Sequence, residues 1–264
     1  MAPTFTVVTC HAGDPFWLEQ LTARIDRTTD VDLVPEIVVV DQDRSPEVTA
    51  ALGRLPRVGR VLTFDEHAGQ HRRLGHDHPN ALNRAVREPF ETSHVVVMDS
   101  DALPIEPDWM ARVLARLQDH DAVIARDPVK RGLTHPCFVV FPVAVGPDVD
   151  FAEGVEEVNL DTGRLVGLQL VHGGLRVDLS RAKPGFSGWH GDLYLDGAVY
   201  HHGHGSFLSS RHQPHHRMVD ERQERFFRHK IEADVFELDR RERLRFTLQR
   251  IGRGAQASVA WSRS

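Results

Sequence analysis

The sequence predicts an α/β fold: a mostly parallel central sheet with helices on both faces. Short valine-rich runs alternate along the chain with stretches whose apolar residues recur at helical intervals. The runs are continuously apolar, which is typical of parallel strands buried on both faces. Strand and helix following one another in this order favour a parallel sheet.

The N-terminal elements are the clearest. Residues 5–10 form a β-branched run that predicts the first strand. Asp14 and Pro15 then resemble a helix cap followed by a proline in the first helical position. One face of the predicted helix collects apolar residues: Trp17, Leu18, Leu21 and Ile25.

The following elements continue the alternation. Strands are predicted over 36–41, 57–64, 94–98 and 122–125, and helices over 46–55, 80–86 and 109–117. Between 127 and 188 the pattern weakens, and we expect loops, a few strands and one helix near 161–173. Residues 199–206 predict a short strand that runs into a glycine- and histidine-rich loop, and 220–248 an amphipathic helix or helix pair.

Composition narrows the class of protein. The 264 residues are 41% hydrophobic, which is enough for one substantial core. A formal net charge of −6 gives no indication of a nucleic-acid partner. Cys10 and Cys137 form no CxxC motif, which favours a reducing compartment. With no long apolar stretch and no secretory signal pattern, we expect no membrane span and a cytoplasmic location.

Two predicted strands end in pairs of acids, Asp41 with Asp43 and Asp99 with Asp101. Ligands of open α/β sheets bind at the carboxyl ends of the strands, so both pairs are expected on one rim. Two carboxylates around Ser100 are oxygen ligands that suit Mg²⁺ or Mn²⁺. A solvated turn capped by aspartate is the alternative reading of the second pair.

The segment "VYHHGHGS" places His201, His202 and His204 beside glycines. Imidazole is a good ligand for cations such as Mn²⁺. Successive side chains of a strand point to opposite faces, so His201 and His202 should not bind the same ion. A surface histidine cluster, or a zinc site without cysteine, remains an alternative.

Two aspartates are candidates for a general base. Asp161 stands at a predicted helix start, where it would either take a proton from an attacking hydroxyl or simply cap the helix. Asp192, in "WHGDLYLDG", is the rival candidate. A further polar group before the helix over 80–86 includes His76, Asp77 and His78. The start of a helix favours anions, so this group is a candidate anion site, but ordinary helix capping accounts for it equally well.

The order of these motifs resembles GT-A-fold glycosyltransferases, above all the large family 2 of inverting enzymes. "VVVDQDRS" matches the acidic end of that family's second strand, and "ALNRAV" matches its "ARN" signature, with Leu82 in place of the arginine. Asp99 and Asp101 match the DxD motif. "LDTGRLVGLQLVHGGLRV" matches its "ED" segment with Leu160 replacing the glutamate, and "AVYHHGHGS" its late "V.H" element.

The resemblance implies a metal-dependent transfer, with inversion, of a sugar from a nucleotide-diphosphate sugar to an acceptor hydroxyl of a small molecule or glycan. It implies Mn²⁺ or Mg²⁺ as cofactor and Asp161 as the base. Metal ligands would come from Asp99, Asp101, His201 and His204. The donor would be bound by Thr9, His11, Asp41, Asp43, Asn83, Asp99 and Ser100.

The implied organisation is a catalytic domain over 1–206, with a nucleotide-binding half over 1–101 and an acceptor-binding half over 102–206, and a helical extension over 207–264. Two other functions compete with the lead. A sugar nucleotidyltransferase would want a glycine-rich basic loop after the first strand, whereas "TCHAGDPF" has one glycine and no basic residue. A non-catalytic sugar-nucleotide-binding protein of the same fold is the other.

Overall fold

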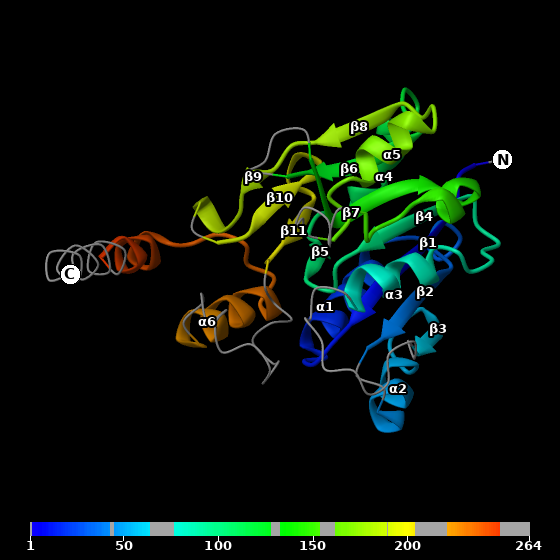
Figure 1. Ribbon diagram of the computed structural model, residues 1–264. Coiled ribbons are helices and arrows are strands. Elements are labelled where there is room, and N and C mark those ends of the chain that lie inside the picture. Colours follow the sequence, from blue (N-terminus) through cyan, green and yellow to red (C-terminus); the bar gives the residue numbers. More distant parts are fainter. Residues whose placement is uncertain are drawn as a thin grey trace, which may run out of the picture.

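The central sheet of the molecule has seven strands in the order β3-β2-β1-β4-β7-β6-β8 (Figure 1). The computed structural model describes residues 2–42, 45–63, 77–127, 133–153, 162–188, 190–203 and 221–248. The strands of this sheet are β1 (Phe5–His11), β2 (Glu36–Asp41), β3 (Val58–Thr63), β4 (His94–Met98), β6 (Ala122–Arg126), β7 (Thr134–Pro142) and β8 (Val177–Ser180).

Most pairings in this sheet are parallel: β3 with β2, β2 with β1, β1 with β4, and β6 with β8. Strand β7 runs antiparallel to both of its neighbours, β4 and β6. The predicted α/β class with a mostly parallel sheet is therefore confirmed. Because β1, β2 and β4 are parallel, their carboxyl ends meet at one rim, as the strand-end acids require.

Helices cover both faces of the sheet (Figure 1). Helices α1 (Phe16–Thr28) and α4 (Trp109–Arg116) bury apolar side chains against one face, and α3 (Asp77–Ala85) and α5 (Val166–His172) against the other. Val95 and Val97 of β4 belong to one of these cores, and Val96 and Met98 to the other. Two covered faces explain why the strand is apolar at every position.

Helix boundaries differ from the predicted ones by a few residues. Helix α2 (Pro46–Leu52) is shorter than predicted; Ser45 caps it by accepting the Val48 N–H at 3.4 Å. At the start of α1 the backbone cap is Pro15, one position later than predicted. The Asp14 carboxylate still accepts the Phe16 N–H at 3.0 Å, so it satisfies a first-turn donor from one residue further out.

A second, smaller sheet was not predicted. It consists of β5 (Ala102–Pro104), β9 (Lys183–Pro184), β10 (Asp192–Tyr194) and β11 (Val199–His201), in the order β5-β11-β10-β9. Its register sets His201 opposite both Ala102 and Asp192. Gly191 has a φ of 68°, and a Cβ there would lie 2.6 Å from the His201 carbonyl oxygen, so glycine permits this close approach.

The remaining helices are short 3₁₀ turns and a C-terminal pair. The 3₁₀ turns are η1 (Val143–Asp148), η2 (Phe186–Gly188) and η3 (Leu195–Gly197). Helix α6 (Glu221–Glu232) and a helical stretch over 240–248 follow, as the amphipathic pattern predicts. Phe227, Ile231 and Phe246 join the same core as α1. No helix in the described ranges has both the length and the apolar content needed to cross a bilayer.

Candidate functional site

The turn after β4 carries Asp99, Ser100 and Asp101 between the two sheets. The Asp99 N–H donates to the Cys137 carbonyl of β7 at 3.2 Å, and the His202 N–H donates to the Asp101 carbonyl at 3.0 Å. Asp101 is 5% exposed, while Asp99 and Ser100 are partly exposed. The turn is thus fixed by backbone bonds to both sheets, which holds its two carboxylates at defined positions.

The His201 imidazole faces both carboxylates. Its Nε2 lies 3.4 Å from Asp101 Oδ1 and 3.6 Å from Asp99 Oδ2. One donor atom from each of the three residues lies within 4.8 Å of the others. Two carboxylate oxygens and one imidazole nitrogen fit a cation such as Mn²⁺ or Mg²⁺. The predicted ligands Asp99, Asp101 and His201 are therefore brought together, whereas His204 lies outside the described residues.

His202 points away from this cluster. Its ring packs on Trp17, with 4.4 Å between the centroids, and its Nε2 lies 2.8 Å from Glu224 Oε2. The Tyr200 hydroxyl lies 2.8 Å from its other ring nitrogen. The expected separation of His201 and His202 onto opposite faces is confirmed.

Three further residues lie near the carboxylates: His135 and Cys137, which the sequence pattern did not indicate, and His78, which was expected only as part of a polar group before the predicted helix over 80–86. His135 and Cys137 of β7 have donor atoms within 4.8 Å of one another and of His201. His78, in the first turn of α3, places Nε2 3.6 Å from Asp99 Oδ1. Positions 135 and 137 share a strand face by alternation, a signal that Pro136 obscured because proline disfavours a strand prediction.

The cluster is electrostatically compensated. Burial alone would raise the pKa of Asp99, but the facing His78 and His201 imidazoles hold it below its usual value. Burial would lower the pKa of His201, but Cys137 and Asp101 together hold it well above the usual value. Histidines thus supply the positive charge that buried carboxylates need, and a bound cation would take over that role by displacing protons.

Asp192 is the candidate base that the described residues include. It lies in β10 directly opposite His201, and it is half-buried. Burial raises its pKa, an effect that His201 and His135 partly offset. Asp161 lies outside the described residues. A carboxylate with a raised pKa beside the cluster has the proton affinity that a general base needs.

The candidate donor-binding residues of β1 and β2 lie at the same rim. The strand register pairs His11 with Asp41, and both are buried. Asp41 Oδ2 accepts a hydrogen bond from the Thr49 hydroxyl at 2.6 Å, so this carboxylate is held inside the fold rather than in a solvated loop. The fully buried Thr9 hydroxyl has no hydrogen-bond partner among the described residues. Asp43 lies outside them.

Asn83 is engaged by the fold itself. Its Nδ2 donates to Asp150 Oδ1 at 2.6 Å, and its Oδ1 accepts the Phe151 N–H at 2.7 Å. Leu82, which replaces the arginine of the family signature, is 1% exposed in the core. Binding of a nucleotide by Asn83 stays a prediction. It would require Asn83 to give up its hydrogen bonds to Asp150 and Phe151.

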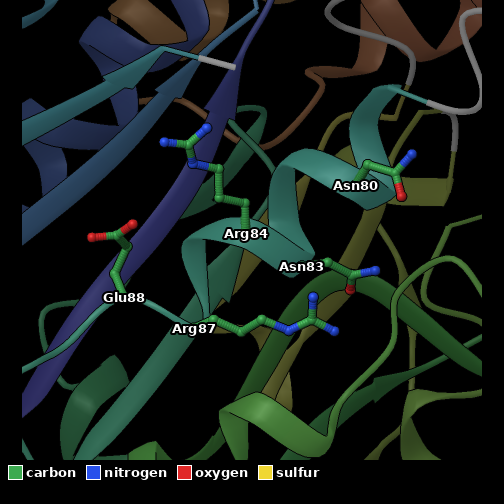
Figure 2. A pocket seen from close by; sticks show the side chains of 5 residues that line it. All are labelled: Asn80, Asn83, Arg84, Arg87 and Glu88. Carbon is green, nitrogen blue, oxygen red and sulfur yellow. The ribbon is translucent and has the colours of Figure 1, made fainter. Parts of the chain in front are cut away.

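A surface hollow of about 280 Å³ adjoins Asn83 on α3. Figure 2 shows Asn83 and Arg87 reaching to one side of the helix and Arg84 and Glu88 to the other. The hollow is lined by Asn80, Asn83, Arg84, Arg87 and Glu88. It contains none of the residues of the carboxylate and histidine cluster.

No protein-family model matches the sequence, and no curated protein matches it. Several solved structures are similar. The mannosyltransferase PcManGT from Pyrobaculum calidifontis, in complex with GDP-Man and Mn²⁺, is 19% identical, with 68% of this chain and 55% of that chain covered and a TM-score of 0.46. TarS from S. aureus is 13% identical, with 75% and 60% covered and a TM-score of 0.47.

A 4-diphosphocytidyl-2C-methyl-D-erythritol synthase from Anaerococcus prevotii is 10% identical, with 69% of this chain and 90% of that chain covered and a TM-score of 0.46. The chain spans 55% and 60% of the length of PcManGT and TarS. Likenesses of this strength concern the fold alone. The chemistry of the residues at the carboxyl end of β4 is what points to a function.

Proposed function

We propose that this protein is a metal-dependent glycosyltransferase that moves a sugar from a nucleotide-diphosphate sugar to an acceptor hydroxyl. The observation that carries the proposal is the convergence of Asp99, Asp101 and His201 at the carboxyl end of β4. In an open α/β sheet this rim is the usual ligand site. Carboxylates fixed there suit a divalent cation that meets a diphosphate.

Asp99, Asp101 and His201 are the residues that would hold Mn²⁺ or Mg²⁺. When bound, such an ion neutralises charge that develops on a departing diphosphate. The protein's own part is to keep the ligands rigid: Asp99 is fixed through its N–H to β7, and His201 through the pairing of β11 with β5 and β10. His78 adds a second imidazole beside Asp99.

The donor's nucleoside is assigned to the ends of β1 and β2, where Thr9, His11 and Asp41 lie, with Ser100 at the end of β4. The support is their position on the same rim as the carboxylates, and the Thr9 hydroxyl, which has no hydrogen-bond partner in the described part of the chain. A buried hydroxyl without a partner costs free energy that a ligand's hydrogen bond would recover. Asp43 and Asn83 stay candidates for the same role.

Asp192 is assigned as the general base, with Asp161 as the alternative. The base takes the proton of the acceptor hydroxyl, whose oxygen attacks the anomeric carbon on the face opposite the leaving diphosphate, so the configuration inverts. Asp192→Asn should keep nucleoside diphosphate binding and lose transfer. If Asp161→Asn does so instead and Asp192→Asn transfers normally, the base is Asp161.

The test is a panel of UDP-, GDP- and dTDP-sugars incubated with the full chain, acceptors and Mn²⁺, with release of nucleoside diphosphate as the readout. Release should need Mn²⁺ and should be lost in Asp101→Asn. Asp108→Asn, an exposed acid paired with Arg112, is the matched control. Undiminished release by Asp101→Asn would refute the metal assignment.

The same assay separates the competing functions. A sugar nucleotidyltransferase would release pyrophosphate from a nucleoside triphosphate and a sugar phosphate. A sugar nucleotidyltransferase should have a basic, glycine-rich phosphate loop after β1. The charged residue in this segment is instead an acid, Asp14, which forms an ion pair with Arg228. A binding protein without turnover would raise its melting temperature with nucleotide and Mn²⁺ yet release nothing with any acceptor.

A further inference from the structure

A second set of metal-type donors lies beside the carboxylates. His135 and Cys137 of β7 and His201 of β11 each offer one donor atom, and these atoms all lie within 4.8 Å of one another. The rings of His135 and His201 are 4.8 Å apart between centroids. His201 therefore belongs to two triads: an oxygen-rich one with Asp99 and Asp101, and one of sulfur and nitrogen with His135 and Cys137.

The backbone fixes the sulfur and nitrogen triad as firmly as the carboxylates. Residues 135 and 137 are two apart in one strand, so their side chains leave the same face. The Cys137 carbonyl accepts the Asp99 N–H at 3.2 Å, and Phe138 pairs with Met98 of β4. Cys137 and His201 are buried, while His135 is partly exposed. The donors are thus held in place and have one side open to solvent.

The donor types of the two triads select different cations. A thiolate with two imidazoles is the kind of set that binds Zn²⁺, in a tetrahedral shell whose remaining position goes to a carboxylate or water. Two carboxylates with one imidazole favour Mn²⁺ or Mg²⁺. Both imidazoles lie within 4.8 Å of the Cys137 sulfur, so one ion can be reached by all three donors.

We propose that His135, Cys137 and His201 form a binding site for a thiophilic divalent cation such as Zn²⁺. Because the two triads share His201, one ion at a time can use this imidazole. A Zn²⁺ ion on the sulfur and nitrogen triad therefore weakens Mn²⁺ binding at the carboxylates. Binding releases the thiol proton to solvent as the bond between sulfur and metal forms. The site itself stands whether or not the protein transfers sugars.

The test uses Co²⁺ as a spectroscopic substitute for Zn²⁺, titrated into the full-length chain. A cobalt–thiolate bond gives a charge-transfer absorption in the near ultraviolet. Wild type should show this absorption, and one equivalent of Zn²⁺ should abolish it. The chain has only two cysteines, so Cys10→Ser retains Cys137 as its sole thiol and should keep the absorption. Cys137→Ser should lose it.

The two cysteine variants keep the test decisive if one of them fails to fold, since either folded variant assigns the absorption. His135→Ala should weaken it, and Asp108→Asn, an exposed acid paired with Arg112, should retain it. The proposal is overturned if saturating Co²⁺ gives wild type no charge-transfer absorption, or if folded Cys137→Ser keeps it.

A second measurement tests the sharing of His201. One equivalent of Zn²⁺ should reduce Mn²⁺ binding in wild type more than in Cys137→Ser, where only direct competition at the carboxylates remains, as read from the electron paramagnetic resonance signal of free Mn²⁺. Equal Mn²⁺ binding with and without Zn²⁺ in wild type would refute the competition. Neither experiment needs a donor or an acceptor, so failure of the glycosyltransferase proposal would leave both results readable.

Discussion

The end of strand β11 carries two neighbouring histidines with different surroundings: His201 is its last residue and His202 follows it. His201 faces two carboxylates, a cysteine and another histidine, a set of metal-type donors. His202 faces Trp17, Tyr200 and Glu224, which hold its ring by a tilted aromatic contact and by hydrogen bonds. The comparison teaches that adjacent histidines at a strand end enter different environments, because alternation separates their side chains: His201 joins the candidate metal cluster and His202 anchors the fold.

We call the group formed by His202, Glu224, Arg228 and Asp14 the anchor face. It connects helix α6 to the start of α1. Glu224 of α6 bonds both His202 and Arg228, and Arg228 also bonds Asp14. The Arg228 guanidinium lies 4.7 Å from the Phe16 ring centroid. One strand therefore separates the candidate metal centre from the contacts that hold α6.

The largest expected effect separates the two histidines by metal binding. His201→Ala should lower Mn²⁺ affinity by about 100-fold, the upper end of the loss seen when a metal site's supporting groups are removed. His202→Ala should change it far less, because its ring faces the other way. Titration of Mn²⁺ followed by electron paramagnetic resonance measures both. Equal losses of Mn²⁺ affinity in the two variants would contradict the different roles assigned to His201 and His202.

Substitutions in the anchor face should instead change the stability of the fold. Glu224→Gln leaves Arg228 and His202 facing a neutral amide, and should lower the free energy of unfolding by about 2 kcal/mol, the scale for a buried charge-assisted hydrogen bond. Urea denaturation measures the change. Glu232→Gln, an exposed position on the same helix, is the control and should stay within about 0.5 kcal/mol of wild type. A control that loses as much as Glu224→Gln would rule out a special role for Glu224.

Arg228→Lys sharpens the same contrast with a smaller effect. Lysine keeps the charge but cannot contact Glu224 and Asp14 through a planar fork or stack as well on Phe16. We expect a loss of about 1 kcal/mol of stability with unchanged Mn²⁺ affinity. Thermal unfolding and the Mn²⁺ titration are measured on the same sample, and weakened Mn²⁺ binding would show that the faces are coupled.

The smallest expected effect is a change in how the melting temperature depends on pH in acidic solution. Burial alone would raise the pKa of Glu224, but His202 and Arg228 hold it below its usual value. A carboxylate whose pKa is lower in the folded state stabilises the fold above its unfolded pKa, about 4.3, and loses that contribution as the pH falls. The melting temperature of wild type should therefore fall more steeply below about pH 4.5 than that of Glu224→Gln. Parallel curves would contradict this assignment.

Much of the parallel half of the fold could be predicted, because most of its strands are continuously apolar, and β2 and β4 lead directly into acids. Asp99 and Asp101 were recognised from that pattern, and the alternation rule separated His201 from His202. Of the second sheet, the short strand beginning at residue 199 was predicted and is β11, whereas the other strands span two or three residues and give no periodic signal. His78, His135 and Cys137 reach the site only through tertiary pairing, which local patterns do not encode.

The central claim is that Asp99, Asp101 and His201 hold a divalent cation against the diphosphate of a donor. Calorimetric titration of UDP and GDP into the full chain, with Mn²⁺ or with a chelator, tests it most directly. Our account predicts that at least one nucleotide binds wild type with Mn²⁺, that the chelator abolishes this binding, and that Asp101→Asn weakens it strongly. Equal nucleotide affinity in Asp101→Asn, or in wild type without the metal, would contradict it.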